Sequence, residues 1–420
     1  MDTQRLAIKG SVLTVDDPRL QGALAAVYET QERPRCLCVP GGIEMYVARH
    51  RQYLVKRMPD TGKQHHPDCS SYEPNPQESG LGELMGHAVL EREPGKVELR
   101  VDFPWMRTVA RGVARGELLA PAAIDAPKRR MSLRALTHYL FERAGFNRWS
   151  PGMEGKRNQG VIHKYLHEAA ADVMIKGLTL DDRLYVPEPF SETVHFDAAE
   201  RRRAKLAVLR PHDGQSPLAL VIGEFKASEA TALGRRLWIK HMPDAPLLVA
   251  RSTWDRIERV FAPLFEARDA DTGHKVRLIF TALIRARREH TYEIDAASLM
   301  LTTEQWIPIE GIHELALLQA LVSQRRRFIK PLRYDARSDA VFPNALLLDT
   351  GVSPVPLHVR SAFIEPKEHG ANDLAAPVLG STAWLWTTDG KMPPLPCPSL
   401  GQSYWHREFE CDSMAGRTKA

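Results

Sequence analysis

Three cysteines and a histidine pair near the N-terminus constrain this chain more than any other feature. Cys36 and Cys38 form a Cys-x-Cys pair, and His66 with Cys69 forms a His-x-x-Cys pair. Zinc takes four nitrogen and sulfur ligands in a tetrahedron, and two closely spaced pairs are a common way to supply them. The spacing therefore predicts a zinc site made by Cys36, Cys38, His66 and Cys69. His65 is the alternative histidine ligand, and buried cysteines beside an exposed histidine pair are the interpretation without a metal.

The segment between the two pairs predicts how they come together. Runs at 45–48 and 53–57 are rich in Tyr, Val and Leu, and they lie between Gly41-Gly42 and Asp60-Thr61-Gly62. These are strand and turn signals, so a β-hairpin is expected to return the chain to its start. Because four protein ligands leave no open coordination position, the zinc is expected to be structural and not catalytic.

The number of cysteines also bears on the compartment. Five cysteines in a chain without a signal-peptide core argue against a disulfide framework, and Cys397 and Cys411 are expected to be free thiols. No apolar run reaches the length that a membrane-spanning helix needs, so we expect a cytoplasmic protein without a membrane partner. The net charge of +5 permits a nucleic-acid partner without requiring one.

The chain of 420 residues is long enough for several domains. Hydrophobic periodicity and turn signals predict a mixed α/β fold in six stretches. These are a zinc-binding β module at 1–80, a β-hairpin and linker at 81–130, a helical region at 131–190, an α/β domain at 191–310, a restriction-endonuclease-like α/β core at 311–398 and a disordered tail at 399–420.

Individual elements are predicted inside these stretches. Ser132 is expected to cap a helix that ends at Gly145, and a second helix is expected over 160–177 with Val173 on its apolar stripe. The α/β domain is expected to have strands at 184–186, 204–210, 218–227, 246–250 and 276–284, with a helix at 254–267. The C-terminal stretch is expected to have a helix over 312–322, strands at 341–348 and 355–363, a polar segment at 365–379 and a strand at 382–386.

One place in the sequence suggests the active site of a metal-dependent nuclease of the restriction-endonuclease type. Such a site pairs an acid on one strand with Glu-x-Lys on its neighbour, and the two acids hold Mg²⁺. Glu224 and Lys226 would share one face of a strand, with Asp213 upstream. However, Asp213-Gly214 also has the sequence of a hairpin turn, which would place Glu224 opposite a residue near Lys205 and leave it without a second acid. A solvent-facing Glu/Lys pair is the alternative.

A second place lies in the C-terminal stretch, whose expected order of helix, strand, strand, helix and strand matches a nuclease core. A turn over 350–353 would place Pro343-Asn344 beside His358-Val359-Arg360. Asn, His and Arg are poor ligands for Mg²⁺, which prefers carboxylate oxygen, and the acids Asp349 and Glu365 lie out of register. This domain is therefore expected to have the shape of a nuclease without its chemistry.

Arginine clusters and tryptophans are the candidates for contacts with nucleic acid. A single cluster is usually a solvated face, whereas several on one surface would bind phosphates with a steep salt dependence. The clusters lie at 201–203, 235–236, 285–288 and 325–327. Tryptophans could stack on bases, although a core position is the default for each; the four considered are Trp149, Trp238, Trp254 and Trp306. The absence of a phosphate-binding glycine loop and of a Gly-x-Ser-x-Gly elbow argues against nucleotide-driven motors and α/β-hydrolases.

The chain resembles a bacterial family, domain of unknown function 1173, whose members often lie in integrative and conjugative elements. The likeness is carried by residues 36–38, 56–59, 66–69, 222–226, 240–243 and 342–349. A looser resemblance, of architecture only, is to competence nucleases of the CoiA kind, which place a zinc module ahead of a nuclease-like domain. These resemblances imply a mobile-element setting, with proteins of the element as candidate partners.

The leading hypothesis is a nucleic-acid-associated accessory protein of a bacterial mobile element, with structural zinc and a degenerate nuclease-like domain. One alternative is an active Mg²⁺-dependent nuclease that uses Glu224 and Lys226 with Asp213. Another is a protein–protein adaptor without a nucleic-acid role, which basic clusters on opposite faces of the structure would favour.

Overall fold

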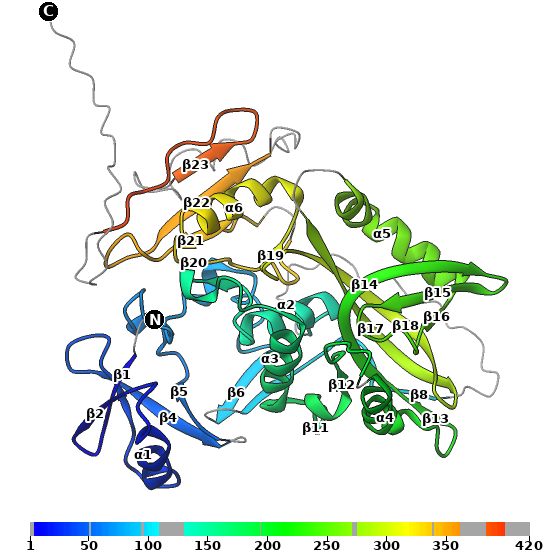
Figure 1. Ribbon diagram of the computed structural model, residues 1–420, viewed down its shortest axis with the longest axis horizontal. Helices are drawn as coiled ribbons and strands as arrows, with labels where there is room; N and C mark the ends of the chain where they lie inside the picture. Colours follow the sequence, from blue (N-terminus) through cyan, green and yellow to red (C-terminus); the bar gives the residue numbers. More distant parts are fainter. Residues whose placement is uncertain are drawn as a thin grey trace, which may run out of the picture.

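The computed structural model describes residues 4–49, 52–93, 96–108, 130–193, 195–270, 275–337, 340–361 and 384–399. This part of the chain has the expected mixed α/β fold, with six α-helices and several separate sheets. The N-terminal module lies at one end of the molecule and a group of long strands at the other, with helices between them (Figure 1). None of the described helices combines the length and the apolar composition needed to cross a lipid bilayer.

The N-terminal module is a five-stranded sheet with one helix packed against it. Its core is small, because only eight buried residues form its hydrophobic cluster. β4 (Ile43–Arg49) and β5 (Tyr53–Arg57) form an antiparallel hairpin, which confirms the hairpin predicted between the two ligand pairs. The sheet has the order β2-β1-β3-β4-β5, and its other elements are β1 (Arg5–Ile8), β2 (Ser11–Thr14), α1 (Leu20–Val27) and β3 (Arg35–Cys36).

Two helices fill the middle of the molecule. α2 (Leu133–Arg143) begins after Ser132, whose hydroxyl accepts a backbone hydrogen bond at 3.2 Å, as predicted for its cap. α3 (Gln159–Ala171) is shorter than predicted, because Val173 lies in a strand and pairs with Val97 of a parallel neighbour. The adjoining sheet has the order β11-β10-β7-β6, with β6 (Val89–Glu93), β7 (Lys96–Leu99), β10 (Val173–Ile175) and β11 (Leu178–Thr179).

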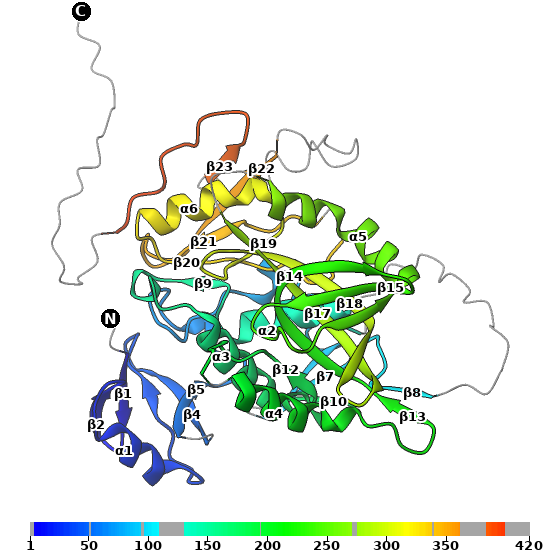
Figure 2. The same cartoon turned by 45° about the vertical axis from the view of Figure 1, so that its right-hand side comes forward.

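The longest strands lie at the far end of the molecule from the N-terminal module (Figure 2). β14 (Ala219–Thr231) pairs with both β15 (Gly234–Ile239) and β17 (Val276–Arg288), so the sheet closes on itself. β16 (Leu247–Ala250) and β18 (Thr291–Thr303) complete the barrel, and α5 (Arg251–Asp269) connects β16 to β17. The sequence did not predict β15 or β18.

One predicted strand is wrong. Residues 204–210 form the end of α4 (His195–Lys205) and the short 3-10 helix η5 (Leu206–Leu209). Leu206 and Leu209 are buried, and their spacing of three residues suits a helical turn better than a strand. Short strands border the barrel: β12 (Leu184–Tyr185) and β19 (Pro308–Ile309) extend its sheet, and β13 (Gln215–Pro217) pairs with β8 (Met106–Thr108).

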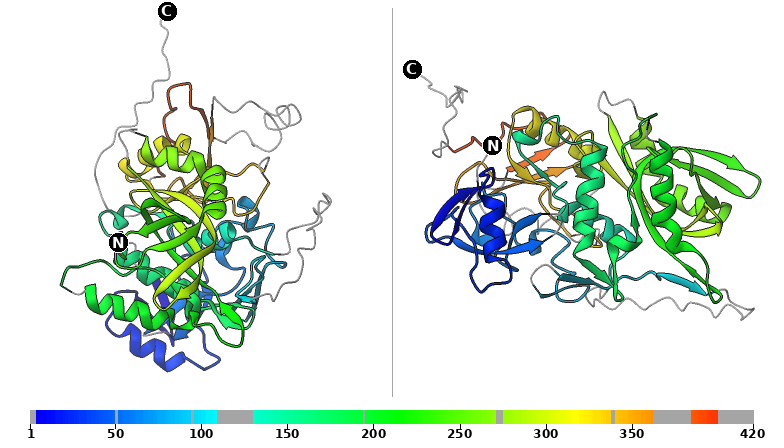
Figure 3. Two further views of the ribbon diagram at one scale, coloured as in Figure 1. Left: turned by 90° about the vertical axis from the view of Figure 1, so that its right-hand side faces the viewer. Right: turned by 60° about the horizontal axis from the view of Figure 1, so that its bottom comes forward.

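The C-terminal sheet combines strands from two distant parts of the chain. Its order is β23-β22-β21-β20-β9, with β22 and β23 parallel. Leucines of α6 (Leu315–Ser323) share one hydrophobic cluster with this sheet and with the barrel interior, so the two regions pack against each other (Figure 3). The strands are β9 (Arg148–Trp149), β20 (Phe328–Ile329), β21 (Ala345–Leu347), β22 (Val355–Arg360) and β23 (Trp384–Thr387). The predicted polar segment at 365–379, Glu365, Cys411 and the predicted tail beyond Ser399 lie outside the described residues.

Candidate metal centre and basic pocket

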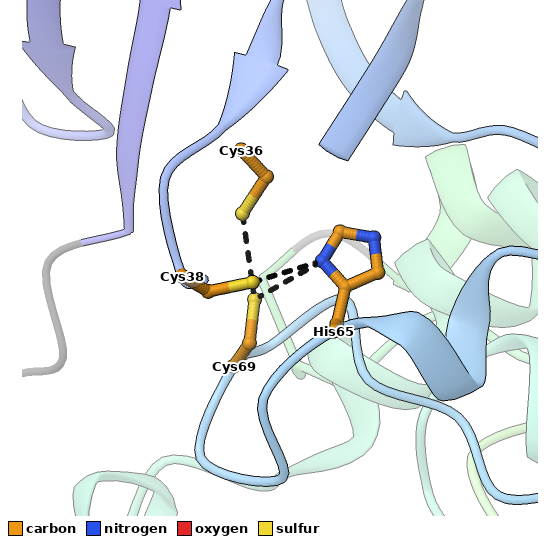
Figure 4. A group of neighbouring side chains, drawn as sticks. All are labelled: Cys36, Cys38, His65 and Cys69. Carbon is orange, nitrogen blue, oxygen red and sulfur yellow. Dashed lines mark hydrogen bonds between the residues drawn. The ribbon is translucent and has the colours of Figure 1, made fainter. Parts of the chain in front are cut away.

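Three thiols and one imidazole meet at the edge of the N-terminal sheet. Cys36 ends β3, Cys38 follows it in the turn toward β4, and His65 and Cys69 come from the loop after β5 (Figure 4). One ligand atom of each residue lies within 4.8 Å of all the others. The hairpin β4–β5 thus returns the chain so that the two halves of the site meet, as the spacing predicts.

Three of the distances within this cluster are close to those of a tetrahedral zinc site. With Zn–S bonds of about 2.3 Å and Zn–N bonds of about 2.0 Å, two sulfurs would lie about 3.8 Å apart and a sulfur and a nitrogen about 3.5 Å apart. Sγ of Cys36 lies 3.6 Å from Sγ of Cys69, and Nδ1 of His65 lies 3.3 Å from Sγ of Cys38 and 3.7 Å from Sγ of Cys69. The donor set therefore fits zinc, and four protein ligands make the site a closed one.

The structure brings His65 and not His66 to the three thiols. The short helix η1 (Gly62–Gln64) turns the chain so that the His65 side chain is buried beside the cluster. The His66 ring instead accepts a hydrogen bond from the backbone N–H of Asp68 at 3.2 Å, and its side chain is 38% exposed. The x-x spacing that favoured His66 therefore selected the wrong member of the pair, and the alternative ligand takes its place.

The charge state of the thiols is set by their contacts with one another. The hydrogen bond with Cys69 lowers the pKa of Cys36 to about 3, and the same bond, together with burial, raises the pKa of Cys69. Burial also raises the pKa of Cys38. Because zinc binds thiolates, metal binding would release protons from these two cysteines. A side-chain N–H of Gln4 donates to Sγ of Cys36 at 3.3 Å, which supports the thiolate.

The loop that carries His65 and Cys69 is also anchored to the C-terminal sheet. Arg148 donates to the carbonyl oxygen of Ser70 at 2.7 Å, and Arg327 donates to that of Asp68 at 2.8 Å. Tyr72 packs on Ile329 and Leu348 beneath the loop. The loop that carries His65 and Cys69 therefore also connects the N-terminal module to the C-terminal sheet.

The first nuclease candidate does not form an acidic site in the described structure. The Glu224 carboxylate is bound by two cations, the Lys240 ammonium at 3.0 Å and the Arg277 guanidinium at 2.8 Å. Lys226 is exposed beside a β-bulge, and Asp213 lies in a turn with a φ of 49°. The turn at Asp213 is confirmed, but the expected partner of Glu224 is wrong, because residue 205 ends a helix and Glu224 pairs with Ile279. Among the described residues, only the cysteine cluster groups three or more metal-ligating side chains closely enough to hold an ion.

The second candidate has the expected strand pairing and a buried ion pair in place of metal ligands. Asn344 lies beside β22, as predicted, and its side-chain oxygen accepts a hydrogen bond from the backbone N–H of Val359 at 2.7 Å. Its amide donates to Glu314 at 2.5 Å, and the Lys330 ammonium lies 3.1 Å from the same carboxylate. Glu314 and Lys330 are each 2% exposed. A lysine ammonium thus neutralises the buried carboxylate, while Asp349 pairs with Arg326 at 2.7 Å.

Two of the four arginine clusters meet in one pocket. The pocket has a volume of about 230 Å³ and lies between the end of α4 with η5 and the turn from β17 to β18. Among the described residues that line it, Glu289 supplies the only carboxylate, and this side chain is 75% exposed. The charged and imidazole side chains that line it are Arg203, Arg210, Arg287, Arg288, Glu289 and His290. The cluster at 325–327 differs, because its members contact Glu154, Asp349 and Asp68.

The tryptophans divide into core residues and one surface residue. Trp149, Trp254 and Trp306 are 3% to 5% exposed, as the default for tryptophan predicts. Trp238 is partly exposed on β15, with the Arg236 guanidinium 5.9 Å from its ring centroid. Sequence reasoning had no signal that separated Trp238 from the others, and it did not identify Arg210, Glu314 or Lys330, because their partners come from distant segments.

No curated protein and no solved structure matches the chain. One family does match, over nearly the whole described length from the N-terminal sheet to the last strand. The chain belongs to the family described as "Protein of unknown function (DUF1173)", whose sequence profile matches residues 6–389.

Proposed function

We propose that this protein is a nucleic-acid-associated accessory protein of a bacterial mobile element, which uses zinc for structure and binds nucleic acid without cutting it. The observation that carries the proposal is the basic pocket at the end of the barrel. The mobile-element setting rests on the family resemblance alone.

The pocket has the charge and donors of a phosphate site. Arg203 and Arg210 come from one segment, and Arg287 and Arg288 come from another about 80 residues later in the chain. Four guanidinium groups face one carboxylate, that of Glu289, which lies 4.0 Å from Arg210 and is 75% exposed. Planar guanidinium groups suit the bidentate binding of phosphate oxygens. Such a cluster on one surface favours a polyanion over the adaptor hypothesis.

The acids that a nuclease would need are engaged in other contacts, which supports binding without cleavage. Glu224 lies between Lys240 and Arg277, and Glu314 is paired with Lys330 inside the protein. Mg²⁺ requires free carboxylate oxygens, and a bound ammonium or guanidinium group competes with the metal for them. Zinc contributes no open coordination position, because Cys36, Cys38, His65 and Cys69 would fill all four.

The experiment is a salt series with labelled DNA and a variant of the pocket. Arg287→Ala/Arg288→Ala is expected to weaken binding and to reduce the slope of log affinity against log salt by about 2, since each phosphate contact contributes about 1. The control is Arg5→Ala/Lys9→Ala, which removes the same charge from exposed positions at the start of β1 and in the turn after it. An unchanged slope in the pocket variant, or no binding of the wild type at low salt, would contradict the proposal and favour the adaptor.

A further inference from the structure

The barrel has a strand order that is associated with a particular kind of ligand. In chain order its strands are β14, β15, β16, β17 and β18, and around the barrel they run β14-β15-β16-β18-β17 and back to β14. β16 and β18 are parallel, and every other neighbouring pair is antiparallel. α5 lies between the third and fourth strands. Numbered one to five, this is the order 1-2-3-5-4-1 of an OB-fold, which binds oligonucleotides and oligosaccharides.

The first strand, β14, pairs with a different neighbour in each half of its length. Residues 219–224 of β14 pair with β17, whereas residues 225–231 pair with β15. Gly223 lies at this change of partner, and a Cβ atom there would overlap the Ile239 side chain of β15. A bulge follows between Phe225 and Ala227. A glycine and a bulge are common devices for bending a strand around a small barrel.

The sides of the barrel differ in how they are covered. Leu220 and Ile279 of the first and fourth strands face the cluster formed by the helical region, and Thr281 hydrogen-bonds Thr137 of α2 at 2.9 Å. α5 closes the barrel with Trp254. β15 and β16 lie at the outer side of the molecule, away from the helical region (Figures 1 and 3). The second and third strands therefore present the open face, which is the ligand face of an OB-fold.

Side chains on this open face suit a nucleic-acid strand. Trp238 and Arg236 point outward on alternate positions of β15, because Leu237 and Ile239 fill the barrel interior. Aromatic rings stack on bases of any sequence, and arginine adds a cation beside the ring. Leu248 lies next to Arg236 in the register of β15 and β16. The face thus offers an aromatic platform, an apolar neighbour and a positive charge.

The basic pocket lies at one end of this face. Tyr292 lines the pocket and pairs with Leu247, which in turn pairs with Leu237 beside Trp238. Since neighbouring strands lie about 4.8 Å apart, the backbone of Tyr292 at the border of the pocket lies about 10 Å from that of β15. At the other end of β16, the turn between β14 and β15 exposes Leu233. A single strand of a few nucleotides could reach from Trp238 to the arginine pocket.

We propose that a single strand of nucleic acid crosses β15 and β16, with a base stacked on Trp238 and backbone phosphates in the arginine pocket. This inference rests on the proposed function and names its ligand. Fold alone does not select the ligand. The four pocket arginines favour a polyanion over a neutral oligosaccharide, and the partly exposed ring of Trp238 favours unpaired bases over a duplex.

The test compares two aromatic–cation pairs at the surface. Trp238→Ala is expected to lower affinity for an oligothymidylate of about 15 nucleotides by about 5- to 150-fold, the range for one stacked base, and Trp238→Phe is expected to retain most of it. The control is Tyr165→Ala on α3, where Lys164 lies 5.1 Å from the ring centroid. Affinity for duplex DNA is expected to change little in Trp238→Ala and in Tyr165→Ala.

Two affinity results would overturn the inference without touching the proposed function. One is wild-type affinity of Trp238→Ala for the single strand while Arg287→Ala/Arg288→Ala weakens binding. The other is an equal loss for single strand and duplex in Trp238→Ala. Crosslinking with a bromodeoxyuridine-substituted strand supplies a readout that does not depend on affinity. The crosslink is expected in β15 or β16. A crosslink confined to other segments would also overturn the inference. A failure of the wild type to bind any DNA would instead end the proposed function.

Discussion

Removing one zinc ligand should open the N-terminal module while leaving the rest of the fold in place. The module has a hydrophobic cluster of only eight buried residues, and a core of this size supplies about 3 to 5 kcal/mol. A structural zinc ion contributes about 10 to 16 kcal/mol of apparent binding energy in small zinc modules. Cys38→Ser is therefore expected to cost the module more than its own core provides. The clusters that contain the barrel and α2 share no residue with that of the module, so both should remain folded.

Metal analysis and hydrogen exchange measure the two parts of this prediction. The wild type is expected to hold about one zinc per chain, and Cys38→Ser well below that, with faster exchange in β3 to β5 and unchanged exchange in the barrel. Cys397→Ser is the matched control, because Cys397 is exposed and lies outside the cluster. His65→Ala should lose zinc and His66→Ala should keep it. Full zinc in Cys38→Ser, or loss only in His66→Ala, would refute the geometry.

Three further predictions concern stability. Lys330→Met is expected to destabilise the protein by about 3 to 5 kcal/mol in urea unfolding, because it leaves Glu314 buried and charged without its partner. Burial lowers the pKa of His138 to about 4, below the unfolded value of about 6.5, so the unfolded chain takes up a proton first as the pH falls. The free energy of unfolding should therefore fall by up to about 3 kcal/mol from pH 6.5 to pH 4. His138→Asn should make this free energy less dependent on pH. Gly223→Ala should cost about 1 to 3 kcal/mol in the same assay, because the added methyl overlaps Ile239.

Each of these stability predictions has a contrary result. Wild-type stability of Lys330→Met would mean that the ion pair is not buried as described. An equal pH dependence in the wild type and in His138→Asn would assign that dependence to other groups. Gly152→Ala is the control for the glycine, because a Cβ atom there would have only Ser150 Oγ near it, at 4.0 Å; an equal cost at both positions would contradict the close approach at Gly223.

Local signals in the sequence predicted the elements that are stabilised by contacts between residues close together in the chain. The cap at Ser132 and the hairpin β4–β5 are examples, since each depends on a few consecutive residues. The clustering of three thiols with a histidine was predicted down to the choice between His65 and His66. That choice depends on which way the His65 and His66 side chains point after η1, and the spacing of the ligands does not determine this.

The barrel could not be predicted, because its closure depends on pairings between distant strands. β15 contains Arg235 and Arg236 and reads as a basic cluster, and the β18 sequence begins with alternating polar residues before it becomes apolar. Their partners are β14, β16 and β17, and only the register with these strands places Leu237 and Ile294 in one core. The arginine pocket was missed for the same reason, because its two halves meet only after the barrel has closed.

The most direct test of binding without cleavage is an assay that measures both together. Zinc-loaded protein is mixed with labelled single-stranded and duplex DNA in Mg²⁺ or Mn²⁺, and each sample is run on a native and on a denaturing gel. A retarded complex is expected at low salt, stronger for the single strand, with every DNA recovered at full length. Shortened products would contradict binding without cleavage and establish the nuclease alternative, and the absence of any retarded complex would contradict the nucleic-acid role.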